Sequence, residues 1–296
     1  MFIENAITGK NLIKEFKGFK LDIKEVNVPK GFATAFIGEN GAGKTTLLNM
    51  MAGIRLDYDG EFEYMGMGTN VDNPEVRESI GYTDPNNYYM PEWTIKQVKD
   101  ITKAIFSSFD ETRFDAICDA LDIPIKNVKH IKQLSDGNKM KLMLASVLAR
   151  NTKTLILDEP ASPLDPVMRD RLCEMIREYI KSGEGERSVF FSTHNIADME
   201  NVTDYAIIMA KGEILEQGFV EDLKEKYVIV KGESKDIKMA EQYLIDMHSS
   251  DYGFEGLALS SKIDCFAGMD IAVEVPTLSQ ICVGIMKTKS SLKNLM

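Results

Sequence analysis

The sequence predicts an α/β fold over its first two-thirds, followed by a small α+β unit. Near-continuous apolar runs alternate with helix-like segments, as in a sheet whose strands are joined by helices. A glycine-rich loop joins one such run to a helix, and two carboxylates directly follow another. Because strands covered on both faces are apolar throughout, we expect buried strands at residues 32–37, 154–157, 188–192 and 205–209.

The composition is that of a folded globular protein. The 296 residues are 44% apolar and 27% charged, which excludes the disordered and fibrous classes. This length predicts one large domain and one smaller domain. The net charge of −11 disfavours non-specific binding to nucleic acid, and we expect no nucleic-acid partner.

The sequence shows no targeting segment and no paired-cysteine motif. No apolar run approaches the roughly 20 residues of a membrane-spanning helix, and the first residues lack the basic and apolar regions of a signal peptide. We therefore expect a cytoplasmic protein. The cysteines form no CxxC pair, which favours reduced thiols over a disulfide framework or a zinc site; they are Cys118, Cys173, Cys265 and Cys282.

A helical insertion separates the first two predicted strands. Thr94 is the expected N-cap of a helix, and a second helix is expected at residues 112–121. Apolar residues follow Thr94 at helical spacing, namely Ile95, Val98, Ile101, Ile105 and Phe109. We expect a helical subdomain at about residues 86–150.

The first domain is expected to span residues 1–226 and a small α+β domain residues 227–296. The boundary follows a turn at Lys211 and Gly212 and a charged segment at residues 221–226. In the second domain we expect a strand at residues 227–230 and a helix carrying Ile237, Ala240, Leu244 and Met247. A half-buried strand with Ile271, Val273 and Val275 should follow, and then a last helix with Leu278, Ile281 and Ile285.

Residues 38–45 match G-x-x-x-x-G-K-[ST], the Walker A phosphate-binding loop. The motif lies between an apolar run and a predicted helix, as such a loop requires. Its glycines let backbone N–H groups and the helix N-terminus face phosphate oxygens. Lys44 supplies a charge to the phosphates and Thr45 a hydroxyl to Mg²⁺; a chance glycine-rich turn is the alternative. The expected nucleotide-binding residues are Gly38, Asn40, Gly41, Ala42, Gly43, Lys44, Thr45 and Thr46.

The apolar run at residues 154–157 ends in Asp158 and Glu159, which is the Walker B pattern. Asp158 would hold Mg²⁺, because a hard cation takes oxygen ligands. Glu159 would polarise the attacking water, a role that contributes about 10²- to 10⁴-fold in rate. The alternative is a solvated turn.

Residues 134–139, Leu-Ser-Asp-Gly-Asn-Lys, open a predicted helix just before Walker B and resemble the LSGGQ signature of ABC-type ATPases. Residues 162–165 are similar to the D-loop of that family, and residues 192–194 to its switch histidine. The resemblance covers about residues 1–226. It implies a P-loop NTPase fold, the ABC-type nucleotide-binding domain, with a mixed sheet and a helical subdomain.

The family resemblance also implies a head-to-tail dimer with two ATP molecules sandwiched between Walker A of one domain and the signature of the other. Ser135 and Gly137 would then face ATP of the partner, and Asp165 would link the two sites. His194 would contact the γ-phosphate and order Glu159. In this family an aromatic residue before Walker A stacks on adenine, and Phe16 is expected here, with Phe19 as the competitor.

The sequence departs from the family in two motifs. The segment at residues 80–86 lacks the usual Q-loop glutamine, so Asp84 or Asn86 is expected to offer an oxygen to Mg²⁺ or water. A turn with no ligand is the alternative. In the signature, Asp136 replaces a glycine and Asn138 the glutamine. A carboxylate near a γ-phosphate is repulsive, although it also favours a helix N-terminus.

The resemblance identifies the chain as the ATP-hydrolysing subunit of a bacterial ABC transporter, and the C-terminal unit is similar to that of bacitracin or multidrug exporters. An integral membrane permease and a second ABC ATPase, identical or related, are the implied partners, which would place the chain on the inner face of the membrane. Tyr88, Tyr89, Pro91 and Trp93 are expected to contact the permease, or to form local core. A soluble ABC ATPase acting on nucleic acid and a nucleotide sensor without turnover are the rival interpretations.

Overall fold

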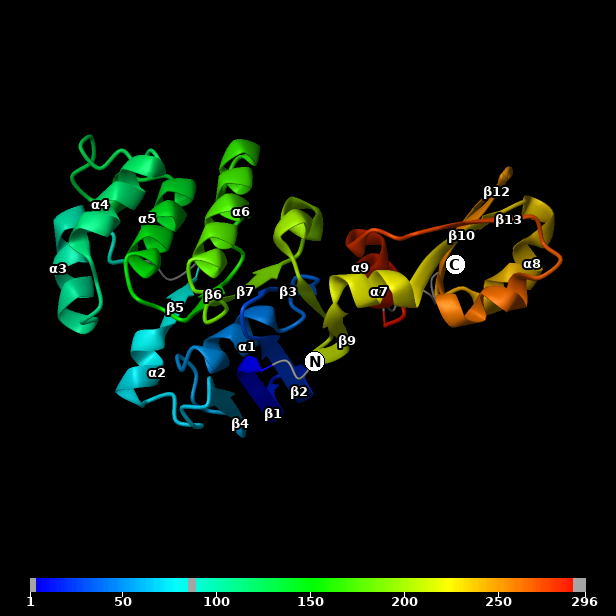
Figure 1. Ribbon diagram of the computed structural model, residues 1–296, viewed down its shortest axis with the longest axis horizontal. Coiled ribbons are helices and arrows are strands. Elements are labelled where there is room, and N and C mark those ends of the chain that lie inside the picture. Colours follow the sequence, from blue (N-terminus) through cyan, green and yellow to red (C-terminus); the bar gives the residue numbers. More distant parts are fainter. Residues whose placement is uncertain (1–3, 85–88, 290–296) are drawn as a thin grey trace.

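The main sheet has six strands in the order β5-β6-β7-β3-β8-β9, and only β9 is antiparallel to its neighbour (Figure 1). This computed structural model describes residues 4–84 and 89–289. The sheet is mixed, as the fold class predicted, and the four expected strands are confirmed to within one residue at each end. The strands are β3 (Ala33–Gly38), β5 (Ile80–Thr83), β6 (Thr154–Leu157), β7 (Ser188–Thr193), β8 (Tyr205–Ala210) and β9 (Glu213–Phe219).

A second, antiparallel sheet packs against one face of the main sheet. It contains β1 (Asn5–Phe16), β2 (Phe19–Pro29) and β4 (Asp59–Tyr64) in the order β2-β1-β4. Helix α1 (Lys44–Met51) shares its core, where Leu47 and Met50 are fully buried together with Phe36 of β3. Because α1 and β3 belong to one hydrophobic core, the loop between them is held at both ends.

Helices cover the opposite face of the main sheet. Helix α5 (Asp136–Leu148) and helix α6 (Pro166–Lys181) bury Leu144 and Ile176 in the same core as Phe191 of β7. The short helices α2 (Pro74–Ser79) and α7 (Val220–Lys226) precede β5 and follow β9. Within residues 4–84 and 89–289, no helix combines the length and the apolar character that a membrane span needs.

Helix α3 (Ile95–Ile105), helix α4 (Glu111–Ala120) and α5 form the helical part of the molecule and share a core of their own. The predicted N-cap is confirmed, since the Thr94 side chain accepts a hydrogen bond from the Gln97 backbone N–H. The predicted apolar stripe is wrong at its end. Helix α3 stops at Ile105, which is 64% exposed, and Phe109 lies beyond the helix in the core.

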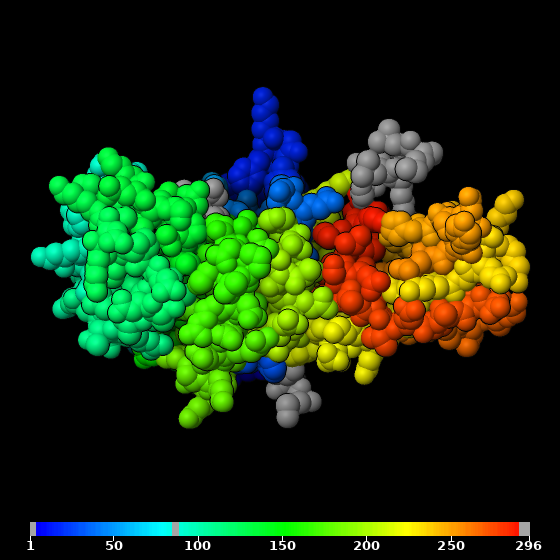
Figure 2. Space-filling model, turned by 90° about the horizontal axis from the view of Figure 1, so that it is seen from above, coloured from blue at the N-terminus to red at the C-terminus, as the bar shows by residue number. Residues whose placement is uncertain are grey.

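The C-terminal residues form a four-stranded sheet at the end of the molecule opposite the helical part (Figure 2). Its strands β10 (Tyr227–Gly232), β11 (Asp246–Ser250), β12 (Gly253–Leu259) and β13 (Ile271–Glu274) lie in the order β11-β12-β10-β13. Helix α9 (Leu278–Lys287) confirms the predicted last helix. It buries Leu278 and Ile281 in the core of the main sheet.

Two predictions for this unit are wrong. The expected long helix is only α8 (Ile237–Ala240), and Met247 lies in β11, where it pairs with Gly256 of β12. The expected half-buried strand ends at Glu274, and Val275 beyond it is 75% exposed. Both segments are short and largely apolar, and in short apolar runs a helical and a strand period are hard to distinguish.

Candidate nucleotide-binding site

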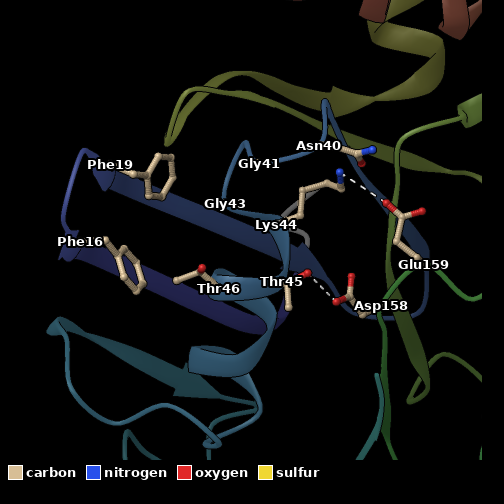
Figure 3. Close-up of a pocket in the computed structure, with 10 residues that line it drawn as sticks. All are labelled: Phe16, Phe19, Asn40, Gly41, Gly43, Lys44, Thr45, Thr46, Asp158 and Glu159. Atoms are coloured by element: carbon tan, nitrogen blue, oxygen red, sulfur yellow. Dashed lines mark hydrogen bonds and ion pairs between the residues drawn. The ribbon is translucent and has the colours of Figure 1, made fainter. Parts of the chain in front are cut away.

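Two strand ends, one helix start and one hairpin enclose a cavity of about 430 Å³ (Figure 3). The end of β3 and the start of α1 contribute the glycine-rich loop, and the end of β6 contributes two carboxylates. The hairpin between β1 and β2 adds two aromatic rings. The lining residues are Phe16, Phe19, Asn40, Gly41, Gly43, Lys44, Thr45, Thr46, Asp158 and Glu159.

The glycine-rich loop is shaped to receive an anion. Gly41 and Gly43 have φ angles of 80° and 108°, a left-handed conformation in which glycine carries no steric penalty. Gly43 is also the N-cap of α1, so the positive end of the helix dipole points toward the cavity. Gly38 and Ala42 do not line the cavity. A Cβ at Gly38 would lie 2.6 Å from the Met209 carbonyl oxygen, and the Ala42 carbonyl accepts from the Gly212 N–H.

Lys44 is almost completely buried beneath this loop. Its Nζ donates to the carbonyl oxygens of Gly38, at 2.7 Å, and Glu39, at 3.2 Å. The same Nζ lies 3.4 Å from Oε1 of Glu159. Lys44, the one cation among the described residues that line the cavity, is therefore fixed beside the phosphate-binding backbone.

Asp158 is fully buried at the end of β6, next to the start of α1. Its Oδ2 accepts a hydrogen bond from Oγ1 of Thr45 at 2.7 Å, and its Oδ1 accepts from the Ser192 hydroxyl. Burial raises the pKa of Asp158, and the charges of Asp84 and Glu159 raise it further, while both hydroxyl hydrogen bonds lower it.

These groups fit a magnesium ion. Thr45 offers a hydroxyl and Asp158 a carboxylate, which are the oxygen ligands that Mg²⁺ prefers. Asp84, only 8% exposed, follows β5 and contributes a further negative charge near Asp158. Asn86, the other Q-loop candidate, lies outside the described residues.

Glu159 and His194 are brought together by β6 and β7. Nδ1 of His194 lies 2.8 Å from Oε2 of Glu159. The Glu159 backbone has a φ angle of +46°, a left-handed conformation that costs a non-glycine residue roughly 1–2 kcal/mol. Strained backbone of this kind clusters at functional sites.

The structure does not bring the signature and D-loop residues to this cavity. Ser135 is the exposed N-cap of α5, where its hydroxyl accepts from the Asn138 N–H at 3.3 Å. Asp165 is the N-cap of α6 in the same way. A Cβ at Gly137 would lie 2.9 Å from the Pro163 carbonyl oxygen, so the two motifs are in close contact. Asp136 is 75% exposed at its side chain and pairs with Lys139 at 2.8 Å.

Both aromatic candidates for the base face the cavity (Figure 3). Phe19 packs against the loop, with its ring 2.9 Å from where a Cβ at Gly43 would be. Phe16 is 39% exposed, so its ring is the more accessible of the two. The Arg55 guanidinium lies 5.3 Å from the Phe16 ring centre. Sequence reasoning missed Arg55, because no motif marks a residue that reaches the site from beyond the end of α1.

A second cavity, of about 670 Å³, lies between the main sheet and the helical part. Tyr89 and Trp93 line it, and the Tyr89 hydroxyl donates to Oγ of Ser146 at 2.6 Å. Its rim is apolar and accessible, since Ile54, Met90 and Ile105 are each more than half exposed. Tyr89 and Trp93 also pack against the core of the helical part. Tyr88 lies outside the described residues.

Comparison with known proteins assigns this arrangement to the ATP-binding cassettes. The family described as ABC transporter matches residues 21–162. The energy-coupling factor transporter ATP-binding protein EcfA1 of Staphylococcus aureus is 30% identical over 222 residues, which cover 72% of this chain and 81% of EcfA1. The chain therefore belongs to the ATP-binding proteins of ABC transporters and carries the ATPase cassette of that family.

Other relatives agree with this assignment. An uncharacterized ABC transporter ATP-binding protein of Synechocystis sp. is 29% identical over 216 residues; the match covers 70% of this chain and 60% of that protein. A solved structure described as the ATP binding subunit of an ABC transporter superposes with a TM-score of 0.64 at 21% identity, over 74% of this chain and 92% of that chain. The predicted fold is thereby confirmed.

Proposed function

We propose that this chain hydrolyses Mg-ATP and thereby drives export through a separate membrane permease. The observation that carries the proposal is the meeting of Lys44, Glu159 and His194 beside the Thr45–Asp158 pair. A site that only bound nucleotide would not require a carboxylate held between a cation and an imidazole. Export is the proposed direction because residues 227–296 resemble the unit appended to exporter ATPases.

Each residue has a distinct task in the proposed reaction. Lys44 and the loop N–H groups bind the phosphates, and Phe16 stacks on the base. Glu159 polarises the attacking water, and His194 orients Glu159 through the contact of 2.8 Å. Thr45, Asp158 and Asp84 would hold Mg²⁺, which when bound neutralises charge on the phosphates. The expected contribution of a positioned acid–base group is about 10²- to 10⁴-fold.

We propose further that the complete site forms between two chains, identical or related. Ser135, Gly137 and Asp165 lie outside the cavity of their own chain, and Ser135 is exposed at the N-terminus of a 13-residue helix. Such a helix start favours an anion, so a γ-phosphate bound to another chain is its proposed ligand. Closure on ATP and opening after hydrolysis would move the permease between two states.

The second cavity is the proposed contact with the permease, which would hold the chain on the inner face of the membrane. An accessible apolar rim suits a partner segment.

We propose that the chain divides into an ATPase domain at residues 1–226, with the helical subdomain at about 86–150, and an accessory domain at 227–296. No nucleic-acid partner is proposed.

Ile105→Glu tests this contact. A charge on the apolar rim should release the chain from membranes prepared from its own cells, because burying an unpaired carboxylate against a partner is unfavourable. ATP turnover by the purified chain should stay within about twofold of the parent, since Ile105 lies outside the nucleotide cavity. The measurement is the fraction of the chain that sediments with membranes.

Val275→Glu is the matched control, because Val275 is also a largely exposed apolar residue but lies in the C-terminal unit. It should leave sedimentation unchanged. Equal sedimentation of the parent and Ile105→Glu would argue against the second cavity as the permease contact.

A further inference from the structure

The hydroxyl of Ser192 bonds to both Walker B residues, to the carboxylate of Asp158 and to the backbone of Glu159. Ser192 lies in β7, one residue before the end of that strand, and is fully buried. Its Oγ accepts a hydrogen bond from the Glu159 backbone N–H at 2.9 Å and donates one to Oδ1 of Asp158. The same hydroxyl thus donates to Asp158, the proposed metal ligand, and accepts from Glu159, the proposed general base.

The bond to the Glu159 backbone holds a conformation that is unfavourable by itself. Glu159 has a φ angle of +46°, and such a conformation persists only where surrounding contacts impose it. The Ser192 hydroxyl supplies one of these contacts directly at the Glu159 N–H. Without it, the backbone can relax and carry the Glu159 carboxylate away from His194.

The bond to Asp158 fixes the orientation of a carboxylate. Oδ2 is engaged by Thr45 at 2.7 Å and Oδ1 by Ser192, so rotation of the carboxylate group breaks both hydrogen bonds. Groups that hydrogen-bond a metal ligand commonly change metal affinity or activity by 10- to 100-fold when they are removed.

We propose that Ser192 is a positioning residue that sets both the metal-binding carboxylate of Asp158 and the backbone of Glu159. This inference rests on the proposed ATPase function and adds a residue to it. Ser192 is not among the described residues that line the nucleotide cavity, and the two hydrogen bonds of its hydroxyl go to Glu159 and Asp158 rather than to Lys44 or the glycine-rich loop. Its loss should therefore weaken metal binding and turnover without weakening nucleotide binding in the absence of metal.

The test compares Ser192→Ala with Ser188→Ala. Ser188 is a matched control, because it is fully buried in the same strand and its hydroxyl also accepts a backbone hydrogen bond, from Gly31 at 2.9 Å. Four residues of strand separate the two serines by about 13 Å. Both variants lose one buried hydroxyl, and the melting temperature of each variant shows whether it still folds.

Three quantities are measured for each variant. The first is the dissociation constant of Mn²⁺, from the electron paramagnetic resonance signal of free Mn²⁺ with a non-hydrolysable ATP analogue. The others are the affinity for that analogue in EDTA and kcat for ATP. Ser192→Ala should weaken Mn²⁺ binding and lower kcat by about 10- to 100-fold each and leave the affinity in EDTA unchanged. Ser188→Ala should change none of the three by more than about twofold.

A second pair of variants separates the hydroxyl from the side-chain volume. Thr and Val have nearly the same shape, so Ser192→Thr should retain Mn²⁺ affinity and Ser192→Val should lose it. This pair decides the question if the alanine variant fails to fold. The proposal is overturned if Ser192→Ala binds Mn²⁺ as Ser188→Ala does, or if the Thr and Val variants behave alike. A parent chain without ATP turnover would instead contradict the proposed function.

Discussion

Glu159→Gln is expected to bind ATP as the parent does and to lose about 10²- to 10⁴-fold in turnover. Gln keeps the volume of the side chain but cannot accept a proton from water. The ion pair with Lys44 at 3.4 Å also disappears, which leaves the Lys44 ammonium to the phosphates. We therefore expect the variant to accumulate as an ATP-bound dimer, which size-exclusion chromatography with Mg-ATP would detect.

Glu184→Gln is the matched control for this substitution. Glu184 also has a positive φ angle, of 48°, but lies in the turn after α6 and does not line the nucleotide cavity. Its turnover should equal that of the parent. If Glu159→Gln hydrolysed ATP at the rate of the parent, Glu159 would not be the general base.

Lys44→Met should weaken ATP binding by about 10- to 150-fold, because hydrogen bonds to charged groups contribute about 1.5–3 kcal/mol. Met has a similar length but lacks both the charge and the donors. The described residues that line the cavity include no second cation, so no other side chain there can replace Lys44. The measurement is the dissociation constant of a fluorescent ATP analogue.

Lys153→Met serves as the control for Lys44→Met. Lys153 is exposed in the segment before β6 and does not line the cavity. Removal of one positive charge there should leave the dissociation constant unchanged. Equal affinities of the Lys44 and Lys153 variants would show that the glycine-rich loop is not the phosphate site.

The glycine-rich loop and the Walker B strand were predictable because their structure is local. The apolar runs of β3 and β6 are buried on both faces, and the loop residues follow directly on the chain. The N-cap Thr94 was predictable for the same reason, since its hydroxyl accepts from a backbone N–H three residues ahead.

Contacts between distant segments were not predictable from these local patterns. Ser192 and Asp158 are 34 residues apart, and only the pairing of β6 with β7 brings them together. Arg55 reaches the Phe16 ring from the segment after α1 for a similar reason. The helix predicted through Met247 failed because tertiary pairing of β11 with β12 overrode a weak local pattern.

Turnover of Ser135→Arg tests most directly whether ATP is clamped between two chains. Ser135 lies outside the cavity of its own chain, so the variant should bind ATP with parental affinity. A long cation at this helix start should block closure on the ATP of a second chain and abolish turnover. Ser135→Ala removes only the helix cap and should have the smaller effect. Undiminished turnover of Ser135→Arg would contradict the shared site.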